Sequence, residues 1–445
     1  MANSLEKEQV DMLVCGRWLI PVNPSEITLE NYAIAIKKGI IVGLMPIADA
    51  EQRYLAEEVY HLDRHVLLPG LINSHGHTAM SLLRGCADDQ TLVNWLEKYI
   101  WPIEAEFVGE DFVRDGSTLA IAEMIRSGTT CFNDMYFYPN ITAKLCQDIG
   151  IRAQISFPIL DFPSAWAEGP DEYISKGLVL RDNFKHSELV NIAFGPHSPY
   201  TLSKEYMTKV ATLAAELDSV VHIHLQETRH EIEQSLTEHQ QRPLDIINGI
   251  GLLGPRTQCV HMTQVDEGDL VLLAETGAHV VHCPQSNMKL ASGVCPITEL
   301  LAADVNVALG TDSAASNNSL DMLQEMRTAA LLAKLSSDDA SALPAHQALL
   351  MATLNGAKAM GIENKVGSLE VGKSADFIAI DFDAASSQPL HDAISQVVYA
   401  TNSRQVSHSW IAGKILLENG KLCTIDIETT LSKARDWQKK IQAAL

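Results

Sequence analysis

Residues 66–77 read VLLPGLINSHGH, an apolar run that ends in two histidines separated by one glycine. Alternate residues of a β-strand point to the same side, so His75 and His77 are expected to project together from the end of a buried strand. Gly76 leaves room between them for the backbone to pass close to a ligand. Imidazole is the commonest metal ligand in proteins, so the pair predicts half of a metal site, with ordinary loop histidines as the alternative.

Seven further runs of this kind follow before residue 313. Each is short, β-rich and mostly apolar without strict alternation, which is typical of a parallel strand buried on both faces. With the first run included, the predicted strands are Val66–Asn73, Thr129–Met135, Arg152–Phe157, Asn191–His197, Val220–Glu227, Gln258–Thr263, His279–Gln285 and Val305–Asp312.

Longer segments with helical periodicity separate most of these runs. Three of them are Asp111–Ser127, Lys204–Leu217 and Leu320–Leu335. Strands and helices that alternate eight times are the pattern of a (β/α)8 TIM barrel, an α/β fold. An open doubly wound sheet is the alternative, but no GxGxxG motif follows the first strand.

Both ends of the chain differ from this middle part. Residues 1–62 contain hairpin-like β runs with a Lys38-Gly39 turn, and residues 367–423 have the same texture. We therefore predict two domains: a (β/α)8 barrel over 63–364 and a small composite β-sandwich over 1–62 and 365–445. The end of the second domain, 427–445, is expected to form a polar helix.

The composition excludes several classes of protein. The formal net charge is −23 and the pI is about 5.0, so neither nucleic acid nor an anionic membrane is expected as a partner. No apolar run reaches the ~18 residues of a membrane span, and the start MANSLEKEQV lacks the apolar core of a signal peptide. The eight cysteines show no CxxC spacing and are interpreted as buried, reduced thiols. These features predict a cytoplasmic protein.

Polar side chains recur where the predicted strands end, which is the side that carries the active site in a TIM barrel. Catalytic zinc takes a few His, Asp or Glu ligands and keeps a position open for water. We predict His75, His77, His224 and Asp312 as the ligands of a single metal ion. The candidate residues on the strands after the first include His197, His222, His224, Glu227, His261, His282 and Asp312.

Two observations bear on the kind of metal site. His222 shares the parity of His224 but lies deeper, so it is expected to pack in the core or to support the site. No lysine ends the fourth strand, NIAFGPH at 191–197, where a bridging carboxylated lysine would hold a second metal. Zinc is the expected ion, and Fe²⁺ or Mn²⁺ would suit the same nitrogen and oxygen ligands.

The motifs PGLINSHGH (69–77), HIHLQE (222–227), HCPQSN (282–287) and LGTDSAASNN (309–318) resemble the amidohydrolase superfamily. They are most similar to its adenosine-type deaminases, which act on 5′-methylthioadenosine and S-adenosylhomocysteine. The resemblance covers nearly the whole chain, including GSLEVGKSADFIAID in the predicted β-sandwich. It implies a zinc-dependent aminohydrolase that converts 5′-methylthioadenosine to 5′-methylthioinosine and ammonia, with S-adenosylhomocysteine and adenosine as further substrates.

The same resemblance assigns roles to single residues. Glu227 would protonate the purine, and Asp312 would take the proton of the attacking water and pass it to the leaving amine. His261 would steady the attacking oxygen through a hydrogen bond. Glu104 matches the family glutamate that accepts both ribose hydroxyls. The family also implies a histidine near the ribose, matched by His197, and an aromatic residue over the substrate, matched by Trp95.

The stretch after the third strand indicates which 5′ group the substrate carries. Relatives that favour S-adenosylhomocysteine are expected to carry arginine near the ends of the third and fourth strands to hold the amino-acid carboxylate. Here PILDFPSAWAEGPDEY (158–173) contains no arginine, and Phe162, Pro163 and Trp166 make it apolar. We therefore predict a preference for 5′-methylthioadenosine. Residues 84–107 are long and aromatic enough to form a lid over the substrate.

Three alternatives stay open. Another deaminase or chlorohydrolase of the superfamily, acting on guanine, cytosine or a triazine, would keep the metal ligands without needing Glu104. A cyclic amidase would use two metals and the bridging lysine, and a non-catalytic barrel would have lost ligands. The expected partner is a small-molecule nucleoside, and the family leaves room for a homodimer or a higher homo-oligomer.

Overall fold

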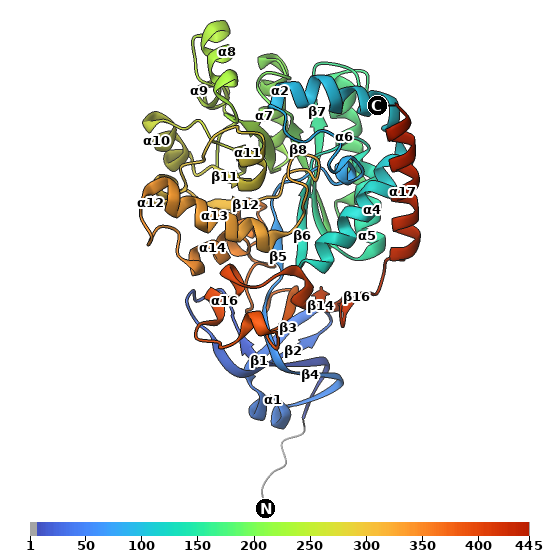
Figure 1. Cartoon of the computed structure of the whole chain (residues 1–445), viewed down its shortest axis with the longest axis vertical. Coiled ribbons are helices and arrows are strands. Elements are labelled where there is room, and N and C mark those ends of the chain that lie inside the picture. The colour runs from blue at the N-terminus through green and yellow to red at the C-terminus, as the bar shows by residue number, and fades with distance from the viewer. Residues whose placement is uncertain (1–6, 445) are drawn as a thin grey trace, which may run out of the picture.

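The computed structural model describes residues 7–444, which form two eight-stranded sheets (Figure 1). One is a parallel barrel, and the other is a mostly antiparallel sheet below it that is built from both ends of the chain. The predicted barrel is thus confirmed, while residues 1–6 and 445 of the predicted domains lie outside the described residues. Within residues 7–444, no helix is both long and apolar enough to cross a membrane.

The barrel strands follow one another in space in the order of the sequence, each parallel to the next. A doubly wound sheet reverses its strand order at a switch point, so this alternative is wrong. The backbone N–H of Ser74 donates to the carbonyl oxygen of Leu309 at 2.8 Å and joins the first strand to the last. The strands are β5 (Leu71–Asn73), β6 (Thr129–Asp134), β7 (Arg152–Ile159), β8 (Val190–Pro196), β9 (Val221–Leu225), β10 (Thr257–His261), β11 (His279–His282) and β12 (Val307–Leu309).

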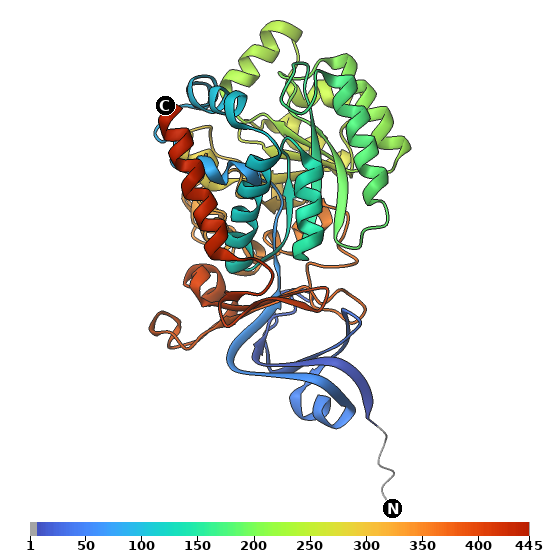
Figure 2. The same ribbon diagram turned by 90° about the vertical axis from the view of Figure 1, so that its right-hand side faces the viewer.

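Helices surround this barrel (Figure 2). The three predicted helices are confirmed as α4 (Glu110–Arg126), α7 (Lys204–Glu216) and α13 (Met322–Ser337). α13 begins later than expected because the Asp321 carboxylate caps its first turn by accepting the N–H of Leu323 at 2.9 Å. Further helices between the barrel strands or after them include α5 (Pro139–Ile149), α6 (Pro170–Phe184), α8 (Arg229–His239), α9 (Pro243–Gly249), α10 (Glu267–Thr276), α11 (Pro284–Lys289), α12 (Ile297–Ala302), α14 (Ala345–Met351), α15 (Leu354–Ala359) and α16 (Ala393–Tyr399), and α1 (Ile47–Arg53) precedes the barrel.

The first predicted barrel strand, Val66–Asn73, is wrong in its first half. Its residues up to Pro69 end β4 (Tyr54–Pro69), a strand of the second sheet that pairs antiparallel with β13 (Phe377–Asp381). Gly70 separates β4 from β5, and a Cβ there would lie 1.9 Å from Thr130 Oγ1, so no larger residue fits. The apolar run could not reveal this division because buried strands of both sheets have the same composition.

The second sheet joins the two ends of the chain where β4 lies beside β13. In its described part, β1 and β4 are parallel and the other neighbours are antiparallel. The predicted turn is confirmed: Lys38 and Gly39 connect β2 to β3, both with positive φ. The remaining strands are β1 (Glu8–Leu19), β2 (Leu29–Lys37), β3 (Ile40–Pro46), β14 (Val406–Ile411), β15 (Lys414–Glu418) and β16 (Lys421–Leu422).

The last helix, α17 (Ile427–Ala444), lies along the barrel rather than on the second sheet (Figures 1 and 2). Phe112 of α4 packs edge-on against Trp437, with ring centroids 5.3 Å apart. The Trp437 indole N–H donates to the Asp115 carboxylate at 3.0 Å. The domain limits at 62/63 and 364/365 stay a prediction, but by these contacts α17 packs with the barrel, although the prediction grouped it with the sheet.

The cysteines are free thiols, as expected, and six of the eight are buried. The prediction was wrong for Cys86, which is partly exposed, and for Cys423, which is exposed after β16. Neither of these two residues lies in a predicted barrel strand, so no apolar strand around them supported the prediction of burial.

A buried ion pair connects the barrel to the second sheet. Arg152 begins β7, at the end of the barrel away from the predicted site, and its Nε donates to Asp376 at 2.8 Å. The side chains are 7% and 1% exposed. Because both charges are removed from water, loss of one partner leaves the other buried and unpaired.

Replacing Arg152 by alanine should therefore lower the free energy of unfolding by about 3–5 kcal/mol. Urea unfolding followed by circular dichroism measures this change. The matched control is Arg114→Ala, which removes an ion pair to Asp111 whose side chains are 41% and 81% exposed and should cost below about 1 kcal/mol. Equal effects of the two substitutions would contradict this assignment.

Candidate active site

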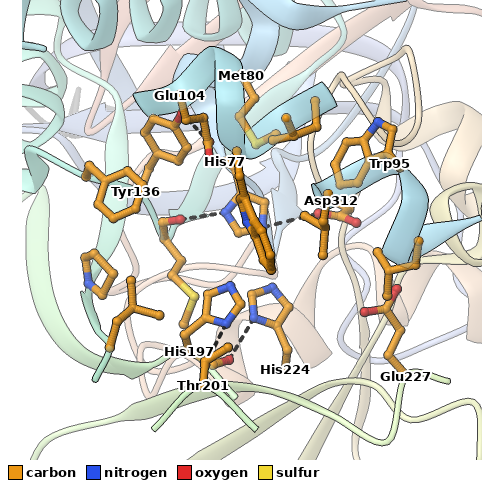
Figure 3. A pocket seen from close by; sticks show the side chains of 18 of the residues that line it. His77, Met80, Trp95, Glu104, Tyr136, His197, Thr201, His224, Glu227 and Asp312 are labelled. Carbon is orange, nitrogen blue, oxygen red and sulfur yellow. Dashed lines mark hydrogen bonds and ion pairs between the residues drawn. The ribbon is translucent and has the colours of Figure 1, made fainter. Parts of the chain in front are cut away.

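The polar side chains predicted at the strand ends meet on one rim of the barrel (Figure 3). His75 and His77 follow β5, His224 lies in β9, His261 ends β10 and Asp312 follows β12. The ring centroid of His75 lies 4.8 Å from that of His77, 4.9 Å from that of His224 and 5.7 Å from that of His261. Parallel strands thus bring together residues that are far apart in the sequence.

Each of the three histidines predicted as ligands is held through its Nδ1 atom. The Nδ1 of His77 donates to the carbonyl oxygen of Met135 at 2.5 Å. The Nδ1 of His224 donates to the carbonyl oxygen of His197 at 2.9 Å. The Nδ1 of His75 contacts another imidazole at 2.7 Å. These contacts leave each Nε2 available for a ligand at the rim.

The arrangement fits the predicted metal. His75 Nε2 is buried and has no hydrogen-bond partner in the described chain, so its lone pair is unsatisfied. Asp312 Oδ1 lies 3.4 Å from the Nε2 atoms of both His75 and His77. The ligand atoms of these three residues lie within 4.8 Å of one another, as do those of His75, His224 and His261. Such nitrogen and oxygen donors suit zinc, and also iron or manganese.

Burial sets the protonation of these groups. It lowers the pKa of His75 to about 4 and holds the pKa of His224 well below its usual value, so both rings are neutral. Burial alone would raise the pKa of Asp312, but the imidazoles of His75 and His77 beside it keep this pKa well below its usual value. For His77, burial lowers the pKa, but Asp312, the Met135 carbonyl and Asp134 together outweigh burial and raise it. The Asp312 carboxylate beside the neutral imidazoles of His75 and His224 is a charge state that suits a cation.

Three serines fix the Asp312 carboxylate. The hydroxyls of Ser286 and Ser316 donate to its Oδ2 at 2.6 and 2.9 Å, and the N–H of Ser313 donates to Oδ1 at 2.7 Å. The sequence analysis assigned these serines no role. Their position in two of the quoted motifs, HCPQSN and LGTDSAASNN, was the available signal.

Glu227 follows β9 and lies buried beside the rim. Its Oε2 lies 3.7 Å from His261 Nε2, and the Ser292 hydroxyl donates to its Oε1 at 3.1 Å. Burial raises the pKa of Glu227, so it retains a proton more readily than an exposed glutamate. The Glu231 carboxylate accepts the N–H groups of Gln226 and Glu227 at 2.9 and 2.8 Å and fixes this turn. Neither Ser292 nor Glu231 was predicted.

A cavity leads from this rim to the segment that follows the first strand. The segment forms η1 (Thr78–Leu83), α2 (Leu92–Trp95), η2 (Leu96–Ile100) and α3 (Trp101–Phe107), and its apolar side chains line the cavity. Trp95, predicted to cover the substrate, is a buried part of this wall. The segment therefore covers the cavity, while its movement as a lid stays a prediction.

Glu104 and Glu227 line the same cavity on opposite sides of Asp312 in the view of Figure 3. Tyr136 Oη donates to Glu104 Oε1 at 2.6 Å, and burial raises the pKa of Glu104 to about 7. His197 also lines the cavity, and burial lowers its pKa to about 3, so it is neutral. Tyr136 was not predicted, because it follows β6 in a loop and meets Glu104 only in the folded chain.

The cavity wall after β7 is uncharged. Pro158, Leu160 and Phe162 line it, and Trp166 packs behind them against Tyr173, with ring centroids 5.7 Å apart. Among the described residues that line the cavity, none is an arginine or a lysine. This part of the cavity therefore suits an apolar group.

Known proteins resemble this chain over nearly its full length. The Amidohydrolase family model matches residues 66–416. A 5-methylthioadenosine/S-adenosylhomocysteine deaminase from Saccharophagus degradans is 50% identical over 98% of both chains. A 5′-deoxyadenosine deaminase from Methanobrevibacter smithii is 41% identical over 85% of this chain and 87% of its own. A crystal structure of an adenosine deaminase from Xanthomonas campestris with bound zinc is 44% identical and covers 98% of this chain and 100% of its own, with a TM-score of 0.97.

Zinc added to the metal-free protein should raise its melting temperature, because a ligand present at 100 times its Kd stabilises the folded state by about 2.7 kcal/mol. His77→Ala should remove most of this shift. The control is His282→Ala, since His282 is buried on β11 and forms no hydrogen bond with the four predicted ligands. A full shift in His77→Ala would show that the ligand set is wrong.

Proposed function

Because this chain belongs to the amidohydrolase family, we propose that it is a metal-dependent deaminase that hydrolyses 5′-methylthioadenosine to 5′-methylthioinosine and ammonia. The observation that carries the proposal is a single cavity that holds two carboxyl groups, the buried Glu227 and the half-buried Glu104, beside a rim of histidines. A purine needs a proton donor and a ribose needs a hydroxyl acceptor, and the two carboxylates fit these needs. The names of the similar proteins support an adenine nucleoside as the substrate.

The metal would be held by His75, His77, His224 and Asp312 and would make a nucleophile available at neutral pH by lowering the pKa of water. Zinc is the ion we propose, since a site of nitrogen and oxygen donors generally binds Zn²⁺ more tightly than Fe²⁺ or Mn²⁺. The zinc in the Xanthomonas campestris structure supports this choice.

The protein's own residues would move the protons. As water adds to C6 of the adenine ring, Glu227 would give its proton to N1, which receives electron density from the ring. Asp312 would accept one proton from the water and deliver it to the amino group, so that the C6–N bond breaks and ammonia leaves. The second water proton would return to Glu227 as the C6 carbonyl forms. His261 would hold the attacking oxygen by a hydrogen bond.

The nucleoside end of the substrate would be recognised by Glu104 and His197. The two oxygens of Glu104 would accept both ribose hydroxyls, while Tyr136 keeps its hydrogen bond to Oε1, which has a second lone pair. His197 is neutral and lines the same cavity, so it can exchange a hydrogen bond with the sugar.

The 5′ group would lie against the uncharged wall after β7. Pro158, Leu160 and Phe162 offer an apolar contact to a methylthio group. A homocysteine tail would bring an amino-acid carboxylate to a wall without arginine or lysine, and this burial would cost free energy. We therefore propose 5′-methylthioadenosine as the preferred substrate.

An ultraviolet assay of adenine-to-hypoxanthine conversion tests the function. 5′-Methylthioadenosine, S-adenosylhomocysteine and adenosine are compared at equal concentration with zinc-loaded protein, and the first should give the highest kcat/KM. Glu227→Gln should lower kcat by at least about 100-fold, as expected for a general acid. A preference for S-adenosylhomocysteine would contradict the 5′ assignment. Turnover of guanine, cytosine or a triazine, without turnover of any nucleoside, would establish the alternative.

Glu104→Gln should raise the KM for 5′-methylthioadenosine by about 10–100-fold, because hydrogen bonds to a charged group contribute ~1.5–3 kcal/mol. In the wild type, kcat/KM should fall below about pH 7, where Glu104 takes up a proton and loses acceptor capacity. This decrease should be smaller in Glu104→Gln, where only the protonation of the nucleophile remains. The matched control is Glu106→Gln, an exposed position on the same helix, which should leave KM unchanged. An unaltered pH profile in Glu104→Gln would argue against the ribose contact.

A further inference from the structure

The orientation of His75 depends on a second imidazole. Its Nδ1 lies 2.7 Å from His222 Nε2, and the two rings are stacked with centroids 5.0 Å apart. His77 and His224 differ, because their Nδ1 atoms donate to backbone carbonyl oxygens, which can only accept. An imidazole nitrogen can either donate or accept, so the contact with His222 alone does not determine which nitrogen of His75 carries the proton.

Gln258 contacts the other ring nitrogen of His222 and determines which of its two nitrogens carries the proton. Its Oε1 lies 2.5 Å from His222 Nδ1, and its Nε2 donates to the carbonyl oxygen of Ala359 at 2.6 Å. The backbone carbonyl therefore fixes the amide with its oxygen toward His222. An amide oxygen only accepts, so His222 carries its proton on Nδ1 and presents an unprotonated Nε2 to His75.

Asn133 is the other polar neighbour of His222, and it does not reverse this order. Its Nδ2 lies 2.8 Å from His222 Nδ1. The same Nδ2 has two acceptors of its own, the carbonyl oxygen of Ser74 at 3.4 Å and Gln258 Oε1 at 3.3 Å. Gln258 Oε1 lies closer to His222 Nδ1 than Asn133 Nδ2 does, at 2.5 against 2.8 Å. The Asn133 amide can also present its oxygen to His222, because the Ser156 hydroxyl beside its Oδ1 can either donate or accept.

We propose that Gln258 and His222 form a hydrogen-bond relay that fixes the tautomer of His75 for metal binding. His222 Nδ1–H donates a hydrogen bond to Gln258 Oε1, and His75 Nδ1–H donates one to His222 Nε2. His75 Nε2 is then unprotonated and keeps its lone pair. That atom is the buried nitrogen without a hydrogen-bond partner in the described chain. The relay rests on the metal site proposed above, and its two members are positioning residues, since neither lines the substrate cavity.

The opposite tautomer shows why the relay matters. If His222 carried its proton on Nε2, it would donate to His75 Nδ1, and the single proton of neutral His75 would lie on Nε2. That nitrogen could then no longer bind a cation, although every heavy atom would keep its place. The relay thus controls metal affinity through the position of a proton.

The test is the dissociation constant for zinc, measured with metal-free protein in competition with a chromophoric chelator and independent of catalysis. His222→Leu removes the acceptor for His75 and should raise the Kd by about 10–100-fold. Gln258→Leu removes the group that selects the tautomer of His222 and should weaken binding at the lower end of that range. His222→Gln should bind almost as tightly as the wild type, because its amide oxygen can accept the proton of His75.

Two controls separate the relay from general damage to the core. His282→Leu removes another buried histidine and should leave the Kd unchanged. At saturating zinc, the KM of the relay variants for 5′-methylthioadenosine should equal that of the wild type, because the cavity is untouched. Circular dichroism of the metal-free proteins verifies folding, and if His222→Leu does not fold, Gln258→Leu and His222→Gln carry the test.

The outcomes are distinct. Wild-type affinity in His222→Leu, or equally weak binding by the leucine and glutamine variants, would overturn the relay. A wild-type protein that binds no zinc would overturn both the relay and the proposed function. If the wild type binds zinc but deaminates no nucleoside, and the variants behave as expected, the relay stands and the proposed function fails.

Discussion

A buried imidazole can bind a metal only if it stays neutral and if its lone pair points at the same place as those of its neighbours. The barrel meets both conditions with its own backbone. Met135 follows β6, the neighbour of β5, and His197 follows β8, the neighbour of β9; their carbonyl oxygens orient His77 and His224. Burial lowers the pKa of His75 and His224. The closed ring of strands therefore supports the site directly, because His77 and His224 are each held by a carbonyl oxygen at the end of the strand next to their own.

Burial has a second effect in the same cavity. It keeps His197 neutral, but it raises the pKa of the two carboxylates, Glu104 and Glu227. Removal from water thus makes Glu104 and Glu227 retain a proton and makes His197 lose one, because it disfavours the charged form of each group. The contacts of Glu104 with Tyr136 and of Glu227 with Ser292 then hold each carboxyl group in one orientation. Burial in the cavity thus prepares Glu104 and Glu227 for acid–base chemistry, while Asp312 in the same cavity keeps its charge.

The sequence predicted the parts of the site that a strand carries. His75 and His77 were expected to point together because strand periodicity requires it, and Asp312 was expected on the same rim because parallel strands share their carboxyl ends. The partners of these residues were not predictable. Ser292, Tyr136 and Gln258 reach their neighbours only through tertiary contacts, which no local pattern encodes. The division of the first strand at Gly70 was missed because burial on both sides of it gives one continuous apolar run.

The pairing of β4 with β13 has a consequence for the order in which the protein can be completed on the ribosome. β4 is synthesised early and runs directly into the first barrel strand, but the strand that covers its edge begins only at Phe377. Until then the apolar edge around Leu68 lacks its β-strand partner. A nascent chain therefore exposes an unpaired strand edge, which can pair with other strands, while the whole barrel is synthesised. The mature fold is reached only after nearly the full length has been translated.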